Sequence, residues 1–269
     1  MTTATAPRPL DLSPRVSPLN GIRQSLTLAW RTVVQVRHNP SELSDMSIQP
    51  VIFTLLFTYV FGGAIAGDAT EYLKFMLPGG LVMHMLFVTM YVGQGLNTDI
   101  TRGVYDRLRS LPIARWAPLA GRIAADQVKQ LWSIMVVLVV GTIFGFRIGT
   151  SVLGLLGAVL LLLGFALAFS WVAVLVGVTA KDPESVQMFG FSLVFPLTFV
   201  SNVFVPTDTM PGWLQAFVDV NPVSILADAC RGMMVGGNVA APLLWSVVWG
   251  LGILAVFAPL AVRAFKKRI

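Results

Sequence analysis

Polar side chains interrupt two long apolar stretches of this sequence, one from about residue 77 to 97 and one from about 185 to 205. The uncharged ones of interest are His84, Tyr91 and Gln94 in the first stretch and Thr198, Ser201 and Asn202 in the second. Such groups donate and accept hydrogen bonds. As a set they could line a path for an amphipathic substrate. The alternative is that each one bonds to a neighbouring helix and holds a bundle together.

Residues for catalysis and for metal binding are missing from the sequence. A single cysteine, Cys230, and two distant histidines, His38 and His84, exclude a disulfide and a multi-cysteine zinc site. No stretch matches the phosphate-binding loop G-x-x-x-x-G-K-[ST], and no carboxylates pair within the apolar stretches. We therefore predict a non-enzymatic chain with no catalytic residue, no metal and no bound cofactor, and we expect no ion-coupled pump.

The composition is that of a membrane protein. Hydrophobic residues make up 55% of the chain, charged residues 12%, and the mean hydropathy is +0.76, whereas about a quarter of a soluble domain is charged. The net charge of +6 is not gathered into one basic patch with aromatic residues among it, so no nucleic acid is expected as a partner. The fold class predicted is an all-α integral membrane protein.

Six apolar stretches reach the roughly 20 residues that a bilayer core requires. They lie at about 47–66, 77–97, 121–146, 152–178, 185–205 and 242–262. Arg122, Asp126 and Lys129 fall in the first turns of the third stretch and are expected at the cytosolic surface. Six transmembrane helices place both termini on one side of the membrane.

The distribution of basic residues indicates which side that is. With a cytosolic N-terminus, Lys74, Arg147 and Arg231 are the basic residues left outside, and all others face the cytosol. Residues 1–18, rich in Thr, Pro, Ser and Ala, are expected to be a disordered cytosolic tail without a cleavable signal peptide. Residues 19–40 read as an amphipathic interfacial helix, and 41–269 as the six-span domain.

A charged segment separates the second and third spans. Its spacing predicts a short helix from about Thr101 to Ser110, which ends before Pro112. One face of that helix would carry Val104, Leu108 and Leu111 with Tyr105 beside them, and the opposite face Arg102, Asp106 and Arg109. The helix is too short to cross a bilayer, so it is either a connector resting on the membrane surface or a docking element for a partner.

The connection after the fifth span holds two further short helices. The first is expected over Pro211–Val218 and presents Trp213, and the second over Pro222–Met233. Asn221 followed by Pro222 is a helix start signal, an N-cap residue before a proline at the first helical position. Both are too short to span, and we expect them to be re-entrant or to lie on the outer leaflet.

Two motifs resemble the membrane subunit of ABC-2 type ABC exporters, most closely the permease subunits of daunorubicin/doxorubicin-type drug-resistance exporters. The cytosolic motif comprises Arg102–Pro112, Arg115, Gly121, Arg122 and Asp126. The outer motif comprises Asn202–Pro206, Met210–Gln215, Asn221, Pro222 and Arg231. The six-span order is the same over nearly the whole chain.

The resemblance implies a half-transporter in the bacterial cell (inner) membrane. Two copies of this chain, or one with a related permease, would sit on two copies of an ATP-binding subunit, which would hold ATP and magnesium. Asp99–Pro112 would be the cytosolic coupling helix, with contacts from Arg102, Val104, Tyr105, Asp106, Leu108, Arg109 and Leu111.

The same resemblance implies the cargo and its route. Hydrophobic drugs or lipids would pass between the two copies along spans one, two and five, within membrane lipid. Two alternatives stay open at this point: a polysaccharide or glycolipid exporter permease, and a membrane scaffold that transports nothing.

Overall fold

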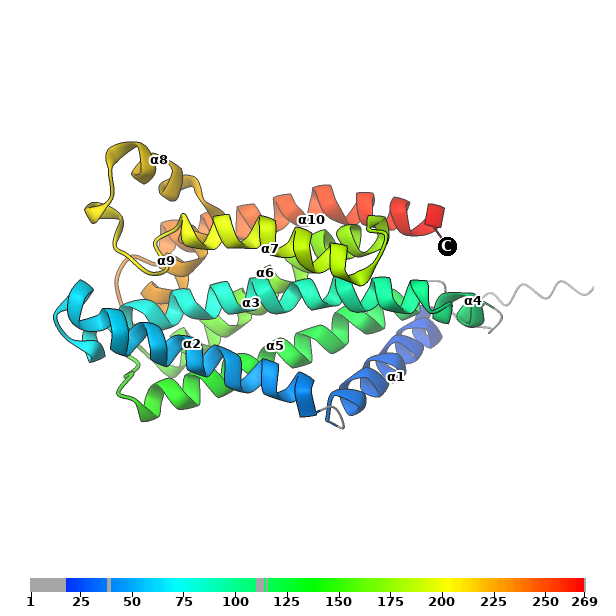
Figure 1. Cartoon of the computed structure of the whole chain (residues 1–269), viewed down its shortest axis with the longest axis horizontal. Helices are drawn as coiled ribbons and strands as arrows, with labels where there is room; N and C mark the ends of the chain where they lie inside the picture. Colours follow the sequence, from blue (N-terminus) through cyan, green and yellow to red (C-terminus); the bar gives the residue numbers. More distant parts are fainter. Residues whose placement is uncertain (1–17, 38–39, 110–113, 115, 269) are drawn as a thin grey trace, which may run out of the picture.

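The structure, a computed structural model, describes residues 18–37, 40–109, 114 and 116–268 of the chain. The tail expected over residues 1–18 therefore lies outside the described residues except for Pro18. Within the described ranges the chain is built from helices and their connections, with no strand. Figure 1 shows the long helices running side by side along one axis.

Five of the described helices are long and apolar enough to cross a membrane, which agrees with the predicted all-α membrane fold. They are α2 (Pro40–Ala66), α3 (Ala69–Thr101), α5 (Ala117–Ile143), α6 (Val152–Thr179) and α10 (Ala240–Arg268). The stretch predicted as a fifth span forms α7 (Pro183–Phe199), which at 17 residues is shorter than the others. A crossing by α7 stays a prediction.

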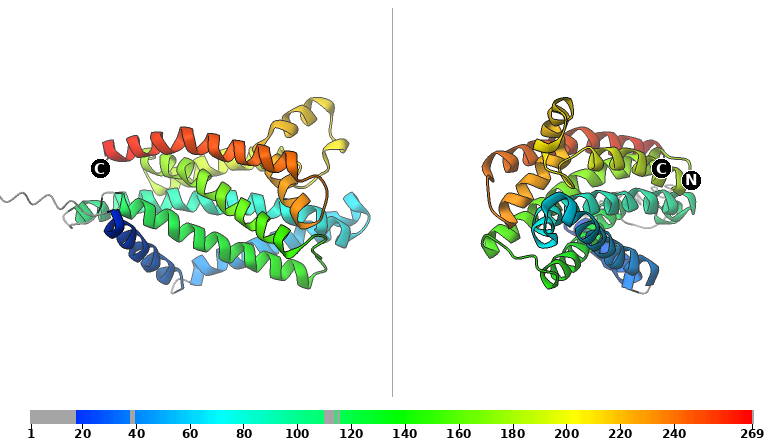
Figure 2. Two further views of the ribbon diagram at one scale, coloured as in Figure 1. Left: turned by 180° about the vertical axis from the view of Figure 1, so that it is seen from behind. Right: turned by 60° about the vertical axis from the view of Figure 1, so that its left-hand side comes forward.

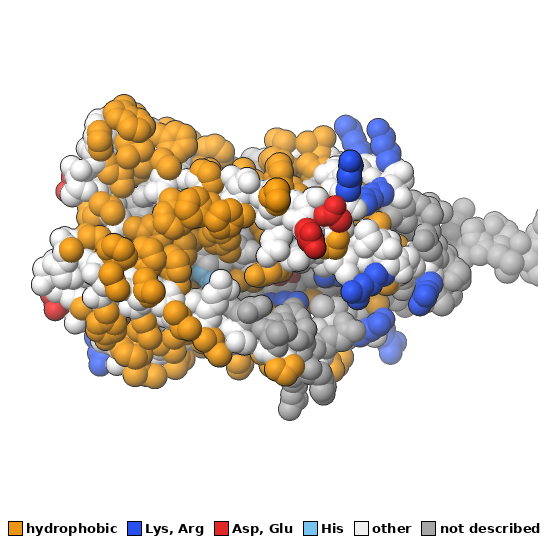
Figure 3. Space-filling view, in the orientation of Figure 1, with side chains coloured by type: hydrophobic (Ala, Val, Ile, Leu, Met, Phe, Trp, Pro, Cys, Tyr) orange, Lys and Arg blue, Asp and Glu red, His pale blue; other side chains and the backbone are white. Residues whose placement is uncertain are grey.

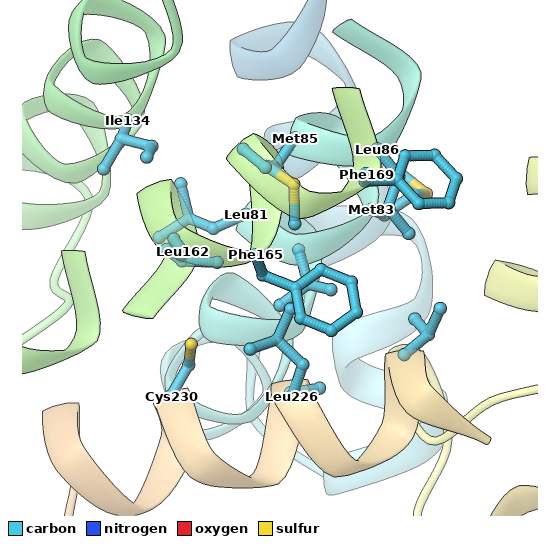
Figure 4. Packing of buried hydrophobic residues seen from close by; sticks show 14 of the residues in the cluster. Leu81, Met83, Met85, Leu86, Ile134, Leu162, Phe165, Phe169, Leu226 and Cys230 are labelled. Atoms are coloured by element: carbon cyan, nitrogen blue, oxygen red, sulfur yellow. The ribbon is translucent and has the colours of Figure 1, made fainter. Parts of the chain in front are cut away.

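Helix α3 is the centre of the bundle. It packs against α2, α5, α6, α7 and α9 (Pro222–Met234), and 78% of its most apolar part is buried inside the protein. Figure 4 shows Leu81 and Met85 of α3 meeting Leu162 and Phe165 of α6 above Leu226 of α9. The remaining long helices leave much apolar surface on the outside, as helices in contact with lipid do.

Helices α3 and α6 approach each other closely at two glycines. A Cβ atom added to Gly93 would overlap the carbonyl oxygen of Ala173, and one added to Gly177 would overlap the backbone of Gly93. One turn along, Asn97 donates its side-chain amide to the carbonyl oxygens of Gly177 and Ala180, both at 2.9 Å. Small residues thus permit a backbone contact that an amide side chain then fixes.

The N-terminal amphipathic helix is present as α1 (Pro18–Arg37), and Figure 2 shows it inclined against α5. Its small residues Gly21, Ser25 and Ala29 are buried, with Ser25 close to Gly121 of α5. The large apolar residues on the other side, Ile22, Leu26 and Trp30, are exposed. Ala29 therefore faces the bundle, where its small side chain allows close packing.

Two helices after α7 match the short elements predicted from the sequence. They are α8 (Gly212–Val220) and α9, preceded by a single turn at Thr207–Thr209. Figures 1 and 2 show α8 projecting from one end of the bundle. Helix α9 is packed inside, against α3, α6 and α10, so it lies under the protein surface and not on it.

Candidate functional site

A cavity of about 330 Å³ lies between α2, α3 and α7. Its aromatic lining is Phe53, Phe87, Phe191, Phe195 and Phe199, and its polar lining is Gln49, Thr54, His84, Tyr91, Gln94 and Gln187. None of the described residues that line it is charged. Figure 3 shows this face as a hollow with orange apolar walls and the pale blue of a histidine at its floor. His84 is the one histidine whose side chain is described.

The aromatic wall follows from helix periodicity on α7. Phe191, Phe195 and Phe199 are spaced four apart, so they form one row along the helix. Neighbouring rings stack, with centroids 5.0 Å apart for Phe191 and Phe195 and 4.1 Å apart for Phe195 and Phe199. The row continues to Phe204 and across to Phe57 of α2, at 5.1 Å and 4.7 Å. Flat aromatic surface of this kind suits a hydrophobic, ring-containing ligand.

The structure brings together three of the polar residues singled out from the sequence. His84, Tyr91 and Gln94 of α3 all line the cavity. Tyr91 is exposed on it, and His84 and Gln94 are half-buried. His84 and Tyr91 are seven residues apart and so share a helix face. It is the face that α3 turns toward α2 and α7.

The other three polar residues lie away from the cavity. Thr198 and Ser201 donate to the carbonyl oxygens of Val194 at 2.8 Å and of Thr198 at 2.5 Å. The Asn202 amide donates to both carboxylate oxygens of Asp228 at 2.9 Å and 2.8 Å. Helix α7 ends at Phe199, so Thr198 and Ser201 secure the chain locally where it leaves the helix, and Asn202 joins it to Asp228 of α9.

A row of polar residues on α5 was not expected in the interior. Asp126, Gln130 and Ser133 are spaced four and three apart, so they share the face of α5 that meets α3. Asp126, expected at the cytosolic surface, is only 5% exposed. Gln130 donates to Thr89 at 2.8 Å. Their spacing places them on the same helix face as neighbouring apolar residues, and this is the sequence signal that could have predicted their burial.

His84 is joined to this row. Its Nε2 atom lies 2.6 Å from the Oγ atom of Ser133, and Ser133 donates to the carbonyl oxygen of Met46 on α2 at 2.9 Å. The contact therefore ties together the three helices α2, α3 and α5 at the floor of the cavity.

The predicted cytosolic helix is divided into two parts. Helix α3 runs on to Thr101, Arg102 caps it in an exposed position, and Gly103 turns the chain with φ +67°. Helix α4 (Val104–Arg109) follows. An ion pair between Asp99 and Arg122 joins α3 to α5 at this end. The expected single helix from Thr101 is thus interrupted by a glycine in the left-handed conformation.

Of the residues predicted to contact a partner here, Arg102 is exposed and Val104 half-buried. Tyr105 is buried, with its ring edge-on to Phe265 of α10 at 5.3 Å, and burial raises its pKa. A ring in this position leaves little surface for a partner. The side chains of Asp106, Leu108 and Arg109 and the whole of Leu111 lie outside the described residues.

Two polar clusters hold the end of the bundle at which α8 and α9 lie (Figure 1). Asn221 accepts from the backbone N–H of Val223 at 2.9 Å and donates to the carbonyl oxygens of Leu197 at 2.8 Å and Val200 at 2.6 Å. It therefore caps α9, as predicted, and also closes the end of α7. Pro222 occupies the first turn of α9.

The second cluster centres on Arg231 of α9, which pairs with Asp228 at 2.5 Å and lies 4.0 Å from the centre of the Phe75 ring. Burial raises the pKa of Asp228, and the Arg231 charge opposes that shift. At the surface of this end, Pro211 is exposed and Trp213 is 77% exposed at the start of α8.

Comparisons with known proteins agree with this architecture. The ABC-2 type transporter family matches residues 23–235. A daunorubicin resistance ABC transporter permease protein of Streptomyces coeruleorubidus is 40% identical over 96% of this chain and 92% of its own length. A probable doxorubicin resistance ABC transporter permease protein of Mycobacterium tuberculosis is 30% identical over 80% of this chain and 78% of its own.

A more distant relative matches a similar share of the chain. An inner membrane transport permease of Escherichia coli (strain K12) is 25% identical over 78% of this chain and 81% of its own length. The matched region covers the cavity, the polar row of α5, and the short helices α4 and α9. The chain therefore belongs to the ABC-2 type transporter family and is a multi-pass membrane permease.

Proposed function

We propose that the chain is the transmembrane permease subunit of an ATP-driven exporter that moves hydrophobic drugs or lipids out of the cell. The observation that carries the proposal is the cavity between α2, α3 and α7, which combines a row of phenylalanines with uncharged polar groups. For a ligand without charge, or with a mostly apolar surface, the free-energy cost of leaving water for such a site is small. The names of the relatives, which refer to daunorubicin and doxorubicin resistance, support the same class of cargo.

The proposed topology has six crossings, with α7 as the fifth. At a rise of about 1.5 Å per residue, a 17-residue helix reaches about 26 Å, close to the hydrocarbon thickness of about 30 Å. The positive-inside rule then places both termini in the cytosol, and α8 and α9 at the outer leaflet as re-entrant elements. Helix α1 would lie at the inner interface with Ile22, Leu26 and Trp30 in the lipid.

A separate ATP-binding subunit would supply the energy. The sequence has no phosphate-binding loop, so ATP and magnesium would be held by that partner, in two copies. Helix α4 stands at the proposed cytosolic end, on a left-handed turn after α3. Because α3 lines the cavity, a movement of α4 would be transmitted along α3 to the residues that contact the cargo.

A second copy of this chain, or a related permease, would complete the path. The cavity opens on a face where α2 and α7 expose large apolar residues. They include Ile48, Ile52, Leu56, Met188 and Phe189. A facing permease would cover the hollow and turn it into a route between the two copies.

Reconstitution tests the proposal. The chain and its ATP-binding subunit are placed together in liposomes, and ATP hydrolysis and transport are measured with apolar drugs, lipids and glycans. We expect apolar compounds to stimulate hydrolysis and to move in an ATP-dependent manner. The matched control is an ATP-binding subunit that binds ATP without hydrolysing it.

Two results would contradict the proposal. Transport by the chain alone, without the ATP-binding subunit, would remove the need for the partner. Stimulation by glycans but by none of the apolar compounds would favour a polysaccharide or glycolipid exporter. A membrane scaffold would associate with partners but would neither stimulate hydrolysis nor transport any of the compounds.

A further inference from the structure

The hydrogen of one buried hydroxyl group behind His84, that of Ser133, can be assigned. Pro50 lies inside α2 and has no N–H, so the carbonyl oxygen of Met46, four residues earlier, lacks its helical donor. The Ser133 hydroxyl lies 2.9 Å from that oxygen and supplies the missing hydrogen bond. A hydroxyl has one hydrogen, and within the membrane an unpaired carbonyl is costly. The Ser133 hydrogen is therefore committed to Met46.

This assignment fixes the protonation state and the tautomer of His84. Its Nε2 atom lies 2.6 Å from the Ser133 oxygen, which has no hydrogen left to offer. The histidine must therefore be the donor, with its hydrogen on Nε2. No charged residue is among the described residues that line the cavity, so nothing there would stabilise an imidazolium. In the neutral ring the Nδ1 atom is then an acceptor with a free lone pair.

The Nδ1 atom has no hydrogen-bond partner among the described residues and is not one of their fully buried polar atoms. His84 lines the cavity, and Figure 3 shows histidine surface at the floor of the hollow. An acceptor at the base of an aromatic pocket, held by its other nitrogen, is a fixed recognition element. The other polar groups of the wall differ, because the amides of Gln94 and Gln187 can turn to donate or to accept.

We propose that His84 selects cargo that carries a hydrogen-bond donor, and that the ligand class of this cavity is a hydrophobic, aromatic molecule with a hydroxyl group. The hydroxyl donates to Nδ1 of His84 while the rings lie against Phe191 and Phe195. Ser133 is a positioning residue, since it holds the ring by Nε2 and leaves Nδ1 as the acceptor. This inference rests on the proposed function and deepens it by naming a feature of the substrate.

The test is a binding measurement with two matched fluorescent probes, 1-hydroxypyrene and 1-methoxypyrene. They share the same rings, and only the first can donate a hydrogen bond. The full chain is placed in lipid nanodiscs, and empty nanodiscs give the background. One hydrogen bond of about 1.4 kcal/mol corresponds to tenfold in affinity, so we expect the hydroxyl compound to bind about tenfold more tightly.

Variants test whether His84 causes the difference in affinity between the two probes. His84→Phe, which keeps a ring but has no acceptor, should bind both probes equally. His84→Gln offers an amide oxygen and should keep part of the preference. Ser133→Ala should reduce the preference, because the ring is no longer held by Nε2. The matched control is Ser170→Ala, since Ser170 is a buried serine that donates to the carbonyl oxygen of Ala166 on α6, at 2.8 Å, and does not line the cavity.

The outcomes distinguish a failure of this proposal from a failure of the proposed exporter function. Equal binding of both probes by the unmodified chain, binding of neither, or a preference that persists in His84→Phe would each overturn the proposal, and the first two need no variant to fold. ATP-dependent export of other apolar compounds would continue in these cases, so the proposed function would stand. If transport fails while the tenfold preference is present, the recognition element stands and the exporter function falls.

Discussion

Arg231 of α9 donates its Nε hydrogen to the carbonyl oxygen of Phe75 on α3 at 3.1 Å, although 156 residues separate them. Pro78 lies one turn further along α3 and, having no N–H, leaves the neighbouring carbonyl oxygen of Lys74 without its helical donor. Arg231 also donates to the carbonyl oxygen of Asn202 at 3.1 Å. One side chain thus joins α9, the central helix α3 and the connector that leaves α7.

The first prediction concerns this junction. Arg231→Ala should lower the free energy of unfolding by about 1–3 kcal/mol, since it leaves partly buried acceptors without their donor. Arg231→Lys keeps the charge but not the planar geometry, so its loss should be smaller. Thermal unfolding in detergent measures both. Equal stability of Arg231→Ala and the unmodified protein would show that the junction contributes little.

The second prediction concerns the crossing of α3 and α6. Gly93→Ala should force the helices apart, because the new methyl group would overlap the backbone of Ala173. We expect a loss of more than about 2 kcal/mol, as for other overpacked sites. Gly252→Ala in α10 is the matched control, since no atom lies within 4 Å of the added carbon. It should be neutral or slightly stabilising, and a similar loss in both variants would refute the account.

The third prediction concerns Asn221. Asn221→Ala removes the cap of α9 and two donors at the end of α7. A lost cap costs about 1 kcal/mol, and the two unpaired carbonyls add to that. Asn221→Asp keeps the capping oxygen but has no amide hydrogen, so it should recover only part of the loss. Hydrogen exchange at α7 and α9 would locate the effect, and protection unchanged at the end of α7 would contradict it.

The fourth prediction concerns the proposed cytosolic end. Arg102 is exposed, so Arg102→Glu should leave the fold intact and weaken association with the ATP-binding subunit, with ATP hydrolysis stimulated less than about one fifth as much. Like charges placed opposite each other across an interface cost several kcal/mol. Asp208→Lys, an exposed charge reversal beyond α7, is the control and should change nothing. Full stimulation in Arg102→Glu would mean that Arg102 is not in the interface.

The sequence by itself determined the membrane fold, the order of the elements and several local features. Apolar stretches of the required length predict membrane helices because a bilayer accepts backbone only when its polar groups are bonded within the segment. The bounds of α6 followed from the extent of one apolar stretch. The cap at Asn221 followed from local chemistry, namely a capping amide before a proline at the first helical position.

Only the tertiary structure decided which polar residues meet. The seven-residue spacing of His84 and Tyr91 places them on one face of a helix. It could not show that Ser133, on another helix, holds the imidazole. Asp126 was expected at the surface because charge near a helix end usually is, whereas the packing of α5 on α3 buries it. Contacts between residues far apart in sequence depend on how whole helices cross, and no local pattern contains that information.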